Sequence, residues 1–395
     1  MRCHPTVRPI FARMLATAPD RLVNPLARWR TDFPIFERRV YLNSCSLGAL
    51  SRQARGRVAG YLDQWDDRGA ANWYDVWWAA LEELRVRYGR VLNAQPGEIA
   101  LHASVSGILG VIGSGLDTRR RRRIVTTGLD FPTLPYQWLP RDVEVVILES
   151  PDGVSVPLEA FERAVNADTA LVATSHVYFT SGAIQDVRAV GELAHRAGAL
   201  CLIDGYQAAG QIPVDVHALD VDFYVTGGLK WLLGGSGITM LYARTATTAA
   251  VIPRATGWFA HREQFSFDPG HFAPHDDARR FETGTPALLA VHAQLGGLDV
   301  VEAAGIPAIR AVTSALTEDL IAAAQSRGLR PKVAATPAER SGIVMLPRTD
   351  PHADVARLAA AGFVVDSRPG HVRVSPYFYN VADDHRALLE ELLDA

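Results

Sequence analysis

Residues 202–242 read LIDGYQAAGQIPVDVHALDVDFYVTGGLKWLLGGSGITMLY, and the rest of the chain is organised around them. The stretch continues an apolar run that ends at Asp204, and it reaches Lys230 after a second strand-like run at 222–226. Glycines flank the lysine at positions 227, 228, 234, 235 and 237. Because ligands of α/β sheets collect at the carboxyl ends of strands, this acid and this lysine indicate a ligand site.

The chemistry that such a pair suggests is that of pyridoxal phosphate. A lysine amine forms a Schiff base with this cofactor, and a carboxylate holds the pyridine nitrogen protonated. Each residue alone has a plain alternative, since an aspartate at a strand end often caps a helix and a lysine in a turn can face solvent. The hypothesis therefore depends on further elements at the expected places.

The composition is that of a globular protein with a large core. The 395 residues are 48% apolar and 21% charged. The net charge of −3 gives no indication of nucleic acid or an anionic membrane as a partner, and no apolar run approaches the length of a membrane span. Three scattered cysteines (Cys3, Cys45, Cys201) argue against a disulfide framework and predict a reducing compartment, the cytoplasm.

The order of patterns predicts an α/β fold. From residue 98 onward, apolar runs alternate with helical patterns, which is typical of a mainly parallel sheet between helices. Strands are expected at 124–127, 143–148, 170–175, 199–204, 222–226 and 237–242, with helices near 51–65, 75–92, 106–116, 133–138, 157–165, 186–197, 286–304 and 306–327. The tail alternates again, with strands at 342–346 and 371–375 and helices at 352–361 and 381–394.

This pattern divides the chain into three parts. An N-terminal arm is expected at 1–40 and a large domain that holds the ligand site at 41–300. A small α+β domain, to which the arm contributes, is expected at 301–395.

Two further elements stand where a phosphate-bearing cofactor needs them. Ser104, Val105 and Ser106 lie at a turn that opens a helix, where free backbone N–H groups and hydroxyls suit an anion. The alternative is a plain serine N-cap. Phe131 follows the strand at 124–127, where its ring either lies flat on a cofactor ring or belongs to the core.

Near the C-terminus an arginine stands in the middle of an apolar strand. The segment HVRVSP at 371–376 predicts that Arg373 is buried, and a buried arginine needs an anionic partner. The α-carboxylate of an amino-acid substrate supplies one in a bidentate pair. An internal salt bridge is the less favoured alternative.

Three other features of the sequence each allow two interpretations. His176, at a strand terminus, is either a base or a hydrogen-bonded structural residue. The five arginines at 119–123 favour a solvated turn over a phosphate or RNA site. A cluster of four tryptophans favours packing in the core or at a subunit interface over a ligand cage; its members are Trp65, Trp73, Trp77 and Trp78.

Taken in order, these motifs resemble the class V aminotransferase group of fold-type I pyridoxal-phosphate enzymes, which includes kynureninases, cysteine desulfurases and isopenicillin N epimerase-like proteins. The resemblance covers roughly residues 40–390. DGYQAAG at 204–210 resembles the group's D-x-x-Q/H-x-x-G, and GLKW at 228–231 resembles G-H-K-W. FPT at 131–133 resembles the kynureninase-type F-P-S, and RVSP at 373–376, with YN at 379–380, resembles R-[VI]-[SA]-P-x-x-Y-N.

The resemblance implies a role for each matching residue in the cofactor's ring system. Lys230 is the Schiff-base lysine, Asp204 meets the pyridine nitrogen, and Gln207 meets the phenolic oxygen. Phe131 stacks on the ring.

Substrate and phosphate contacts are implied as well. Arg373 binds the substrate carboxylate, and Asn43 is assigned to the substrate beside it. The chain is expected to form a homodimer with active sites at the subunit interface, because GW at 257–258 and GTP at 284–286 resemble segments that reach the phosphate from the neighbouring subunit. The residues expected to bind the phosphate are Ser104, Val105, Ser106 and Thr226, with Trp258 and Thr285 of the neighbouring subunit.

The departures from the group's pattern concern substrate and reaction. Leu229 stands where a His or Tyr usually touches the phosphate, so Thr226, Ser104 and Ser106 are the candidates for that contact. Residues 361–375 contain no cysteine, which argues against desulfurase chemistry through a persulfide. Gln207 in place of His, together with the lack of a Tyr before the lysine, weakens an assignment as a kynureninase itself.

The implied mechanism begins with a substrate amine that displaces Lys230, which then removes the Cα proton as a general base. An aminotransferase is the default, and a β-cleaving lyase, a kynureninase-like hydrolase and an epimerase are the alternatives, because all share this step. No metal is expected. A non-catalytic relative remains a rival, as does a dinucleotide-binding protein, although the glycines at 113–115 and 234–237 do not follow a strand as G-x-G-x-x-G.

Overall fold

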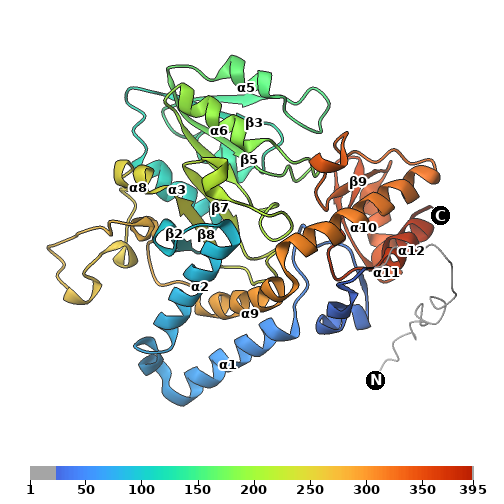
Figure 1. Ribbon diagram of the computed structural model, residues 1–395, viewed down its shortest axis with the longest axis horizontal. Coiled ribbons are helices and arrows are strands. Elements are labelled where there is room, and N and C mark those ends of the chain that lie inside the picture. The colour runs from blue at the N-terminus through green and yellow to red at the C-terminus, as the bar shows by residue number, and fades with distance from the viewer. Residues whose placement is uncertain (1–23, 394–395) are drawn as a thin grey trace.

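The computed structural model describes residues 24–393, and its centre is a seven-stranded sheet (Figure 1). The strand order is β2-β8-β7-β6-β5-β3-β4, and only β8 runs antiparallel to its neighbours. The strands are β2 (Ile99–His102), β3 (Arg123–Thr127), β4 (Glu144–Leu148), β5 (Thr169–Ser175), β6 (Leu200–Asp204), β7 (Phe223–Gly227) and β8 (Thr239–Ala243). The predicted mainly parallel sheet is confirmed, and the six predicted strands lie within two residues of the observed ones. β2 was not predicted.

Helices cover both faces of this sheet because its strands are apolar on both sides. Successive residues of a strand point to opposite faces, so Leu202 of β6 packs in one core cluster while Cys201 and Ile203 pack in another. The first cluster contains α3 (Val105–Gly115), and the second contains α2 (Trp77–Leu92), α6 (Val187–Arg196) and α9 (Leu288–Ala304). The remaining helices of the large sheet region are α1 (Arg52–Arg68), α4 (Thr133–Tyr136), α5 (Leu158–Ala164), α7 (Val216–Leu219) and α8 (Thr245–Ala250).

The C-terminal part forms a separate small sheet with its own core. β9 (Val344–Pro347), β11 (Asp366–Arg368) and β12 (His371–Val374) pair antiparallel in the order β11-β12-β9. The helices α10 (Ile306–Ser326), α11 (Pro351–Ala360) and α12 (Ala382–Leu393) supply apolar residues to a third core cluster. This arrangement is the α+β ending that the sequence predicts. The domain boundaries at 40 and 300 stay a prediction.

The N-terminal segment packs on this C-terminal part, as Figure 1 shows for the blue and red elements. β1 (Val40–Tyr41) pairs in parallel with β10 (Phe363–Val364), and Arg30 forms an ion pair of 2.7 Å with Asp384. Asn24 donates from Nδ2 to two backbone carbonyls of the segment 378–380, each at 2.7 Å. The first part of the predicted arm, 1–23, lies outside the described residues.

Several side features have simple structural explanations. The arginines at 119–123 form local contacts that include ion pairs of Arg119 with Asp117 at 2.8 Å and of Arg123 with Glu144 at 3.0 Å, which fits the predicted solvated turn. Trp77 is buried, and Trp78 stacks on Phe259 with ring centroids 5.4 Å apart. Within 24–393 no single helix is long and apolar enough to cross a membrane; α9 and α10 pass that test only as a pair that bends by 79°.

Candidate active site

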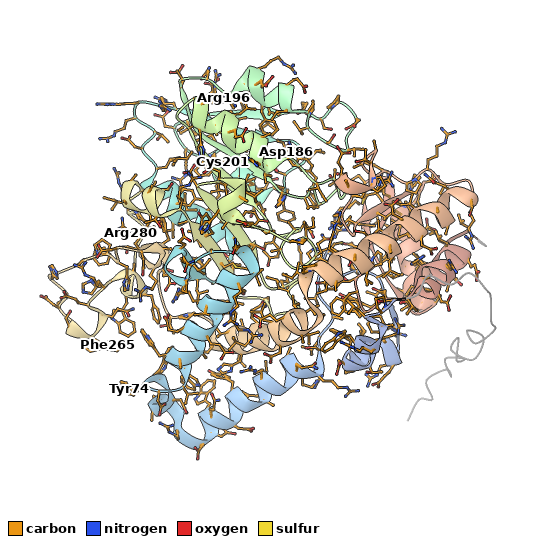
Figure 2. The ribbon with its side chains drawn as sticks, in the orientation of Figure 1. Tyr74, Asp186, Arg196, Cys201, Phe265 and Arg280 are labelled. Carbon is orange, nitrogen blue, oxygen red and sulfur yellow. The ribbon has the colours of Figure 1, made fainter. Side chains whose placement is uncertain are left out.

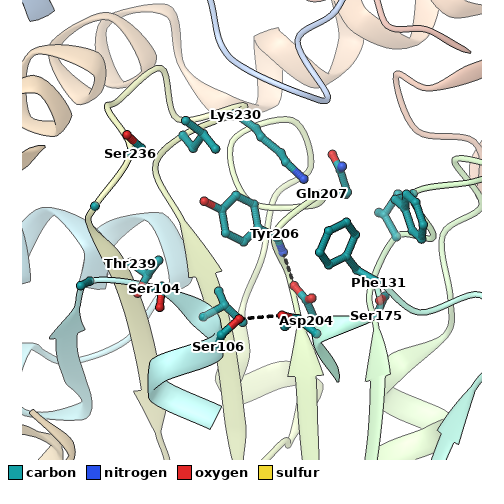
Figure 3. A pocket seen from close by; sticks show the side chains of 17 residues that line it. Ser104, Ser106, Phe131, Ser175, Asp204, Tyr206, Gln207, Lys230, Ser236 and Thr239 are labelled. Atoms are coloured by element: carbon teal, nitrogen blue, oxygen red, sulfur yellow. Dashed lines mark hydrogen bonds between the residues drawn. The ribbon is translucent and has the colours of Figure 1, made fainter. Parts of the chain in front are cut away.

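A cavity of about 320 Å³ opens at the carboxyl ends of the parallel strands (Figure 3). Ser175 ends β5, Asp204 ends β6, and Thr239 begins the antiparallel β8 at the same edge. Seven predicted site residues line this cavity: Ser104, Val105, Ser106, Phe131, Asp204, Gln207 and Lys230. The other lining residues are Ala103, Thr133, Ser175, Val177, Phe179, Tyr206, Leu229, Ser236, Gly237 and Thr239.

Asp204 forms the acidic end of the cavity. Its carboxylate is buried, with 6% of the residue exposed, and it accepts a hydrogen bond of 2.9 Å at Oδ1 from the backbone N–H of Tyr206. Burial raises its pKa to about 6, against the lowering effect of the nearby Lys230 charge. Its second oxygen, Oδ2, accepts no hydrogen bond from residues 24–393, so it is open to a donor in the cavity.

Lys230 lies in the glycine-rich turn that follows β7. Its ammonium nitrogen is 4.6 Å from the ring centroid of Tyr206 and 6.0 Å from that of Phe131. Burial lowers its pKa to about 8, and the charges of Arg373 and Arg368 act in the same direction. An amine with this pKa is partly neutral at physiological pH, which suits a nucleophile or a base.

The turn is held tightly by its glycines. A Cβ on Gly228 would lie 1.4 Å from Oε1 of Gln294, and a Cβ on Gly234 would lie 2.0 Å from the same atom. Gln294 is fully buried and donates from Nε2 to the carbonyl of Leu232 at 3.1 Å. The sequence GGLKWLLGG therefore folds around a buried glutamine of α9, which fixes the position of the lysine.

Phe131 is placed beside the cavity by the preceding aspartate. Asp130 is buried and accepts four hydrogen bonds that join the ends of β3 and β5; the donors are Thr126 Oγ1, Thr127 N, Thr174 Oγ1 and Ser175 N, at 2.7–3.2 Å. The ring of Phe131 is 47% exposed and meets Phe179 edge to face at 5.2 Å. Its exposure favours the predicted stacking surface over the alternative of a core residue.

The turn that opens α3 has both of its predicted features. Ser104 caps the helix, since its hydroxyl accepts from the N–H of Gly107 at 3.1 Å. Ser106 shares a hydrogen bond of 2.6 Å with Thr133, and both Ser104 and Ser106 remain exposed to the cavity. The N-cap therefore coexists with a helix N-terminus that faces the cavity, where an anion is favoured.

Gln207 is fixed on both sides of its amide. It donates from Nε2 to the carbonyl of Cys45 at 3.0 Å and accepts at Oε1 from Nε1 of Trp231 at 2.8 Å. Trp231 belongs to the GLKW motif and is fully buried. This hydrogen bond joins the DGYQAAG motif to the GLKW motif directly.

His176 is a structural residue. It is buried, its Nδ1 lies 2.9 Å from the hydroxyl of Tyr224, and its backbone N–H donates to the carbonyl of Asp204 at 2.8 Å. Burial lowers its pKa to about 4, which keeps the ring neutral. It does not line the cavity, so the structure favours the second of its two sequence interpretations.

Arg373 is buried, but its guanidinium has a partner within the chain. Nη2 donates to Asp366 Oδ2 at 2.8 Å and to Ser46 Oγ at 2.5 Å, and Nη1 donates to the carbonyl of Phe179 at 3.2 Å. The internal salt bridge, which the sequence left as the less favoured alternative, is therefore present. Nε of Arg373 is buried and donates to none of the described residues, and Arg373 does not line the cavity, so its predicted contact with the substrate has no support from its position.

Five predicted site residues do not line the cavity of their own chain: Arg373 and the four that follow. Thr226 is fully buried, and its hydroxyl donates to the carbonyl of Gly205 at 3.3 Å, so the predicted phosphate contact has no support from its position. Asn43 lies in the turn after β1, where it pairs with Ser375 in an isolated bridge. Trp258 and Thr285 are exposed at other places on the chain, so any contact they make with a site must be with that of another subunit.

The sequence interpretation missed Tyr206, Thr133, Ser236 and Thr239 as lining residues. Their signal was weak but present. Thr133 is the last residue of the FPT motif that begins with the predicted stacking aromatic, and Ser236 and Thr239 follow the lysine within one turn and strand. Tyr206 stands inside the motif that was used to assign Asp204 and Gln207.

The fold and the cavity define a class of protein: an α/β protein whose cavity, at the carboxyl ends of the strands, is lined by a lysine amine and a buried carboxylate. The sequence matches the aminotransferase class-V family over residues 77–386. It is 32% identical to a Bacillus subtilis protein named as an uncharacterised aminotransferase, over 92% of this chain and 96% of that protein. It is 28% identical to a kynureninase of Pseudomonas fluorescens, over 76% of this chain and 74% of that protein.

The fold is shared with solved structures. A cysteine desulfurase of Thermococcus onnurineus, 21% identical, superposes with a TM-score of 0.85 over 94% of this chain and 98% of that one. The chain belongs to the aminotransferase class-V family, a family of pyridoxal-phosphate enzymes. The predicted family and, with it, the predicted cofactor pyridoxal 5′-phosphate are confirmed.

Proposed function

We propose that the protein is a pyridoxal-phosphate-dependent aminotransferase that acts at Cα of an amino acid. The observation that carries the proposal is the position of Lys230, whose amine of lowered pKa lies between two aromatic rings in the cavity that Asp204 lines. The relative that is 32% identical carries the name of an aminotransferase, which supports this reaction type.

The cavity has the donor set that the cofactor needs. Asp204 has an open, buried oxygen for a protonated ring nitrogen, and Phe131 offers an exposed aromatic face. The helix N-terminus at Ser104–Ser106 would hold the phosphate. Gln207 lines the cavity near Lys230 (Figure 3), where it would contact the phenolic oxygen.

When bound, pyridoxal phosphate supplies an aldehyde that condenses with amines and a protonated ring that accepts the electrons of a broken bond at Cα. The residues of the chain do the rest. Asp204 keeps the proton on the ring nitrogen, and Lys230, once its amine is free, removes the proton from Cα of the substrate. Arg373, whose Nη2 is held by Asp366 and Ser46, would orient the substrate carboxylate through its positive charge.

A lyase or hydrolase of the kynureninase type is the second candidate function. The similarity to kynureninase over three quarters of the chain favours it, as does the position of Phe131 beside the cavity. An epimerase would use the same groups. Persulfide chemistry has no support, because Cys45 and Cys201, the cysteines in the described part of the chain, are buried and neither lines the cavity.

A homodimer is part of the proposal. The segment around Trp258 carries exposed aromatic side chains: Trp258 stacks on Phe267 at 6.1 Å, and Phe265 and Phe267 are 58% and 72% exposed. Figure 2 shows Phe265 at the same edge of the molecule as Tyr74, which is 84% exposed. A second copy would cover this surface and bring Trp258 and Thr285 to its partner's cavity.

The dimer can be tested by mixing two inactive variants. A Lys230→Ala subunit and a Thr285→Arg subunit should each bind cofactor poorly alone, while mixed dimers regain one complete site. Sedimentation that gives a monomer at all concentrations would contradict this part of the proposal. The cytoplasmic location remains a prediction from the cysteine content.

The reaction type is tested with the purified holoenzyme. Each amino acid is added in turn, the visible absorbance of the cofactor is followed, and the product is analysed. A keto acid without loss of a side-chain fragment supports the aminotransferase, whereas an eliminated or cleaved fragment identifies a lyase and inverted stereochemistry an epimerase. An unchanged visible band in Lys230→Ala would overturn the assignment of the lysine.

A further inference from the structure

Tyr206 is a cavity residue whose hydroxyl has no partner. Its ring lies 4.6 Å from the Lys230 nitrogen, and its backbone N–H is used by Asp204. Its hydroxyl forms no hydrogen bond with any residue between 24 and 393. In Figure 3 the hydroxyl points to the side of the cavity where Ser236, Thr239 and Ser104 lie, away from Phe131.

The ring of Tyr206 fits at this place because residue 227 is a glycine. A Cβ on Gly227, at the end of β7, would lie 2.5 Å from both the hydroxyl oxygen and Cζ of Tyr206. The backbone of Gly227 is not left-handed, so its conformation does not require glycine. Glycine is needed there because any larger residue would collide with Tyr206.

Some of the other hydroxyl groups near this end of the cavity already donate hydrogen bonds to backbone carbonyls. Leu229 lines the cavity, but its side chain has no donor. Thr239 donates its hydroxyl to the carbonyl of His102 at 2.9 Å, and Thr226 donates to that of Gly205. Ser236 also lines this end, and its hydroxyl, like that of Tyr206, forms no hydrogen bond with the described residues. A phosphate at the N-terminus of α3 would therefore find free hydroxyl donors in Ser236 and Tyr206.

We propose that the Tyr206 hydroxyl donates a hydrogen bond to the phosphate of the cofactor and takes the place of the donor that Leu229 lacks. The inference rests on the proposed function, since it needs pyridoxal phosphate in this cavity. Burial raises the pKa of Tyr206 to about 12, and the charge of Asp204 adds to the effect. The phenol therefore stays protonated and remains a donor at physiological pH.

The test compares two ligands that differ only in the phosphate. Dissociation constants of pyridoxal phosphate and of pyridoxal are measured by equilibrium absorbance with the apo-protein and with Tyr206→Phe, which keeps the ring. Loss of one hydrogen bond to a charged group should weaken pyridoxal phosphate by roughly 10- to 100-fold and leave pyridoxal within about twofold. The exposed Tyr136, changed to Phe, is the matched control and should change neither constant.

A reciprocal pair of variants tests the same geometry without depending on one substitution. Tyr206→Ala opens the space beside position 227, and Gly227→Ser added to it places a hydroxyl on the Cβ that now fits. The double variant should recover at least about tenfold of the phosphate affinity that Tyr206→Ala loses. Gly227→Ser alone should destabilise the protein, because its Cβ collides with the ring.

The outcomes separate this inference from the proposed function. Equal weakening of both ligands by Tyr206→Phe, or no weakening of pyridoxal phosphate, would overturn the role of Tyr206 while leaving the cofactor assignment intact. Failure of the wild-type apo-protein to bind either ligand would instead contradict the proposed function.

Discussion

The pKa of Lys230 gives a prediction about the rate at which the apo-protein takes up its cofactor. Burial lowers this pKa from 10.5 to about 8. An amine with a pKa of about 8 has roughly 300 times more of its neutral, reactive form at pH 7 than one with a pKa of 10.5. The rate constant for uptake should therefore rise with pH and level off above about pH 8, because the neutral form accumulates as pH rises through the pKa.

The assay mixes apo-protein with pyridoxal phosphate between about pH 6 and about pH 10 and follows the visible absorbance. Nα-acetyl-lysine, measured in the same way, corrects for ionisation of the reagent. The chain contains only one other lysine, Lys332, which does not line the cavity. Lys332→Arg is therefore the matched control and should not change the profile.

The same assay gives a test of the electrostatics. The charge of Asp204 raises the pKa of Lys230, so Asp204→Asn should move the midpoint of the profile to lower pH. A midpoint that stays near that of Nα-acetyl-lysine would refute the buried position of the lysine. A midpoint that moves to higher pH in Asp204→Asn would refute the proposed proximity of the two charges.

Three further predictions concern the walls of the cavity. Asp130→Ala leaves four buried donors without an acceptor and should lower the free energy of unfolding in urea by about 3 kcal/mol, whereas a loss below about 1 kcal/mol would contradict the role of Asp130 in joining β3 to β5. Phe131→Ala should weaken cofactor binding roughly fivefold in equilibrium titration, while the exposed Tyr136→Ala should not; equal constants for the two variants would refute stacking. Arg373→Ala should raise KM for the amino acid roughly 100-fold with little change in cofactor content, and loss of cofactor instead would show that Arg373 is misplaced.

The fold was predictable because most strands of its central sheet are continuous apolar runs in the sequence. A strand that is buried on both faces is a short, continuous apolar run, as at 199–204, and the helices between such runs keep their own period. β2 was missed because it is only four residues long and closely follows α2. β10 and β11 were missed for the same reason, since two and three residues carry no readable alternation.

The site was predictable only in part. Asp204, Lys230 and Phe131 were found because each follows a strand within a recognisable motif, and parallel strands bring such positions together. The sequence did not predict that Asp366 pairs with Arg373. Asp366 lies opposite Arg373 in the β11–β12 pair, and that register depends on three-dimensional pairing. The packing of Tyr206 against Gly227 likewise depends on how the ends of β6 and β7 lie side by side.

The central claim is that Lys230 carries the cofactor, and the chain allows a direct measurement of it. Reduction of the holoenzyme with borohydride fixes the cofactor to the amine that holds it, and peptide mass mapping then identifies that amine. Lys230 and Lys332 are the only two lysines in the sequence. The account predicts that the added mass appears on the peptide containing Lys230 alone. A label on Lys332 or on the N-terminal amine, with Lys230 unmodified, would contradict it.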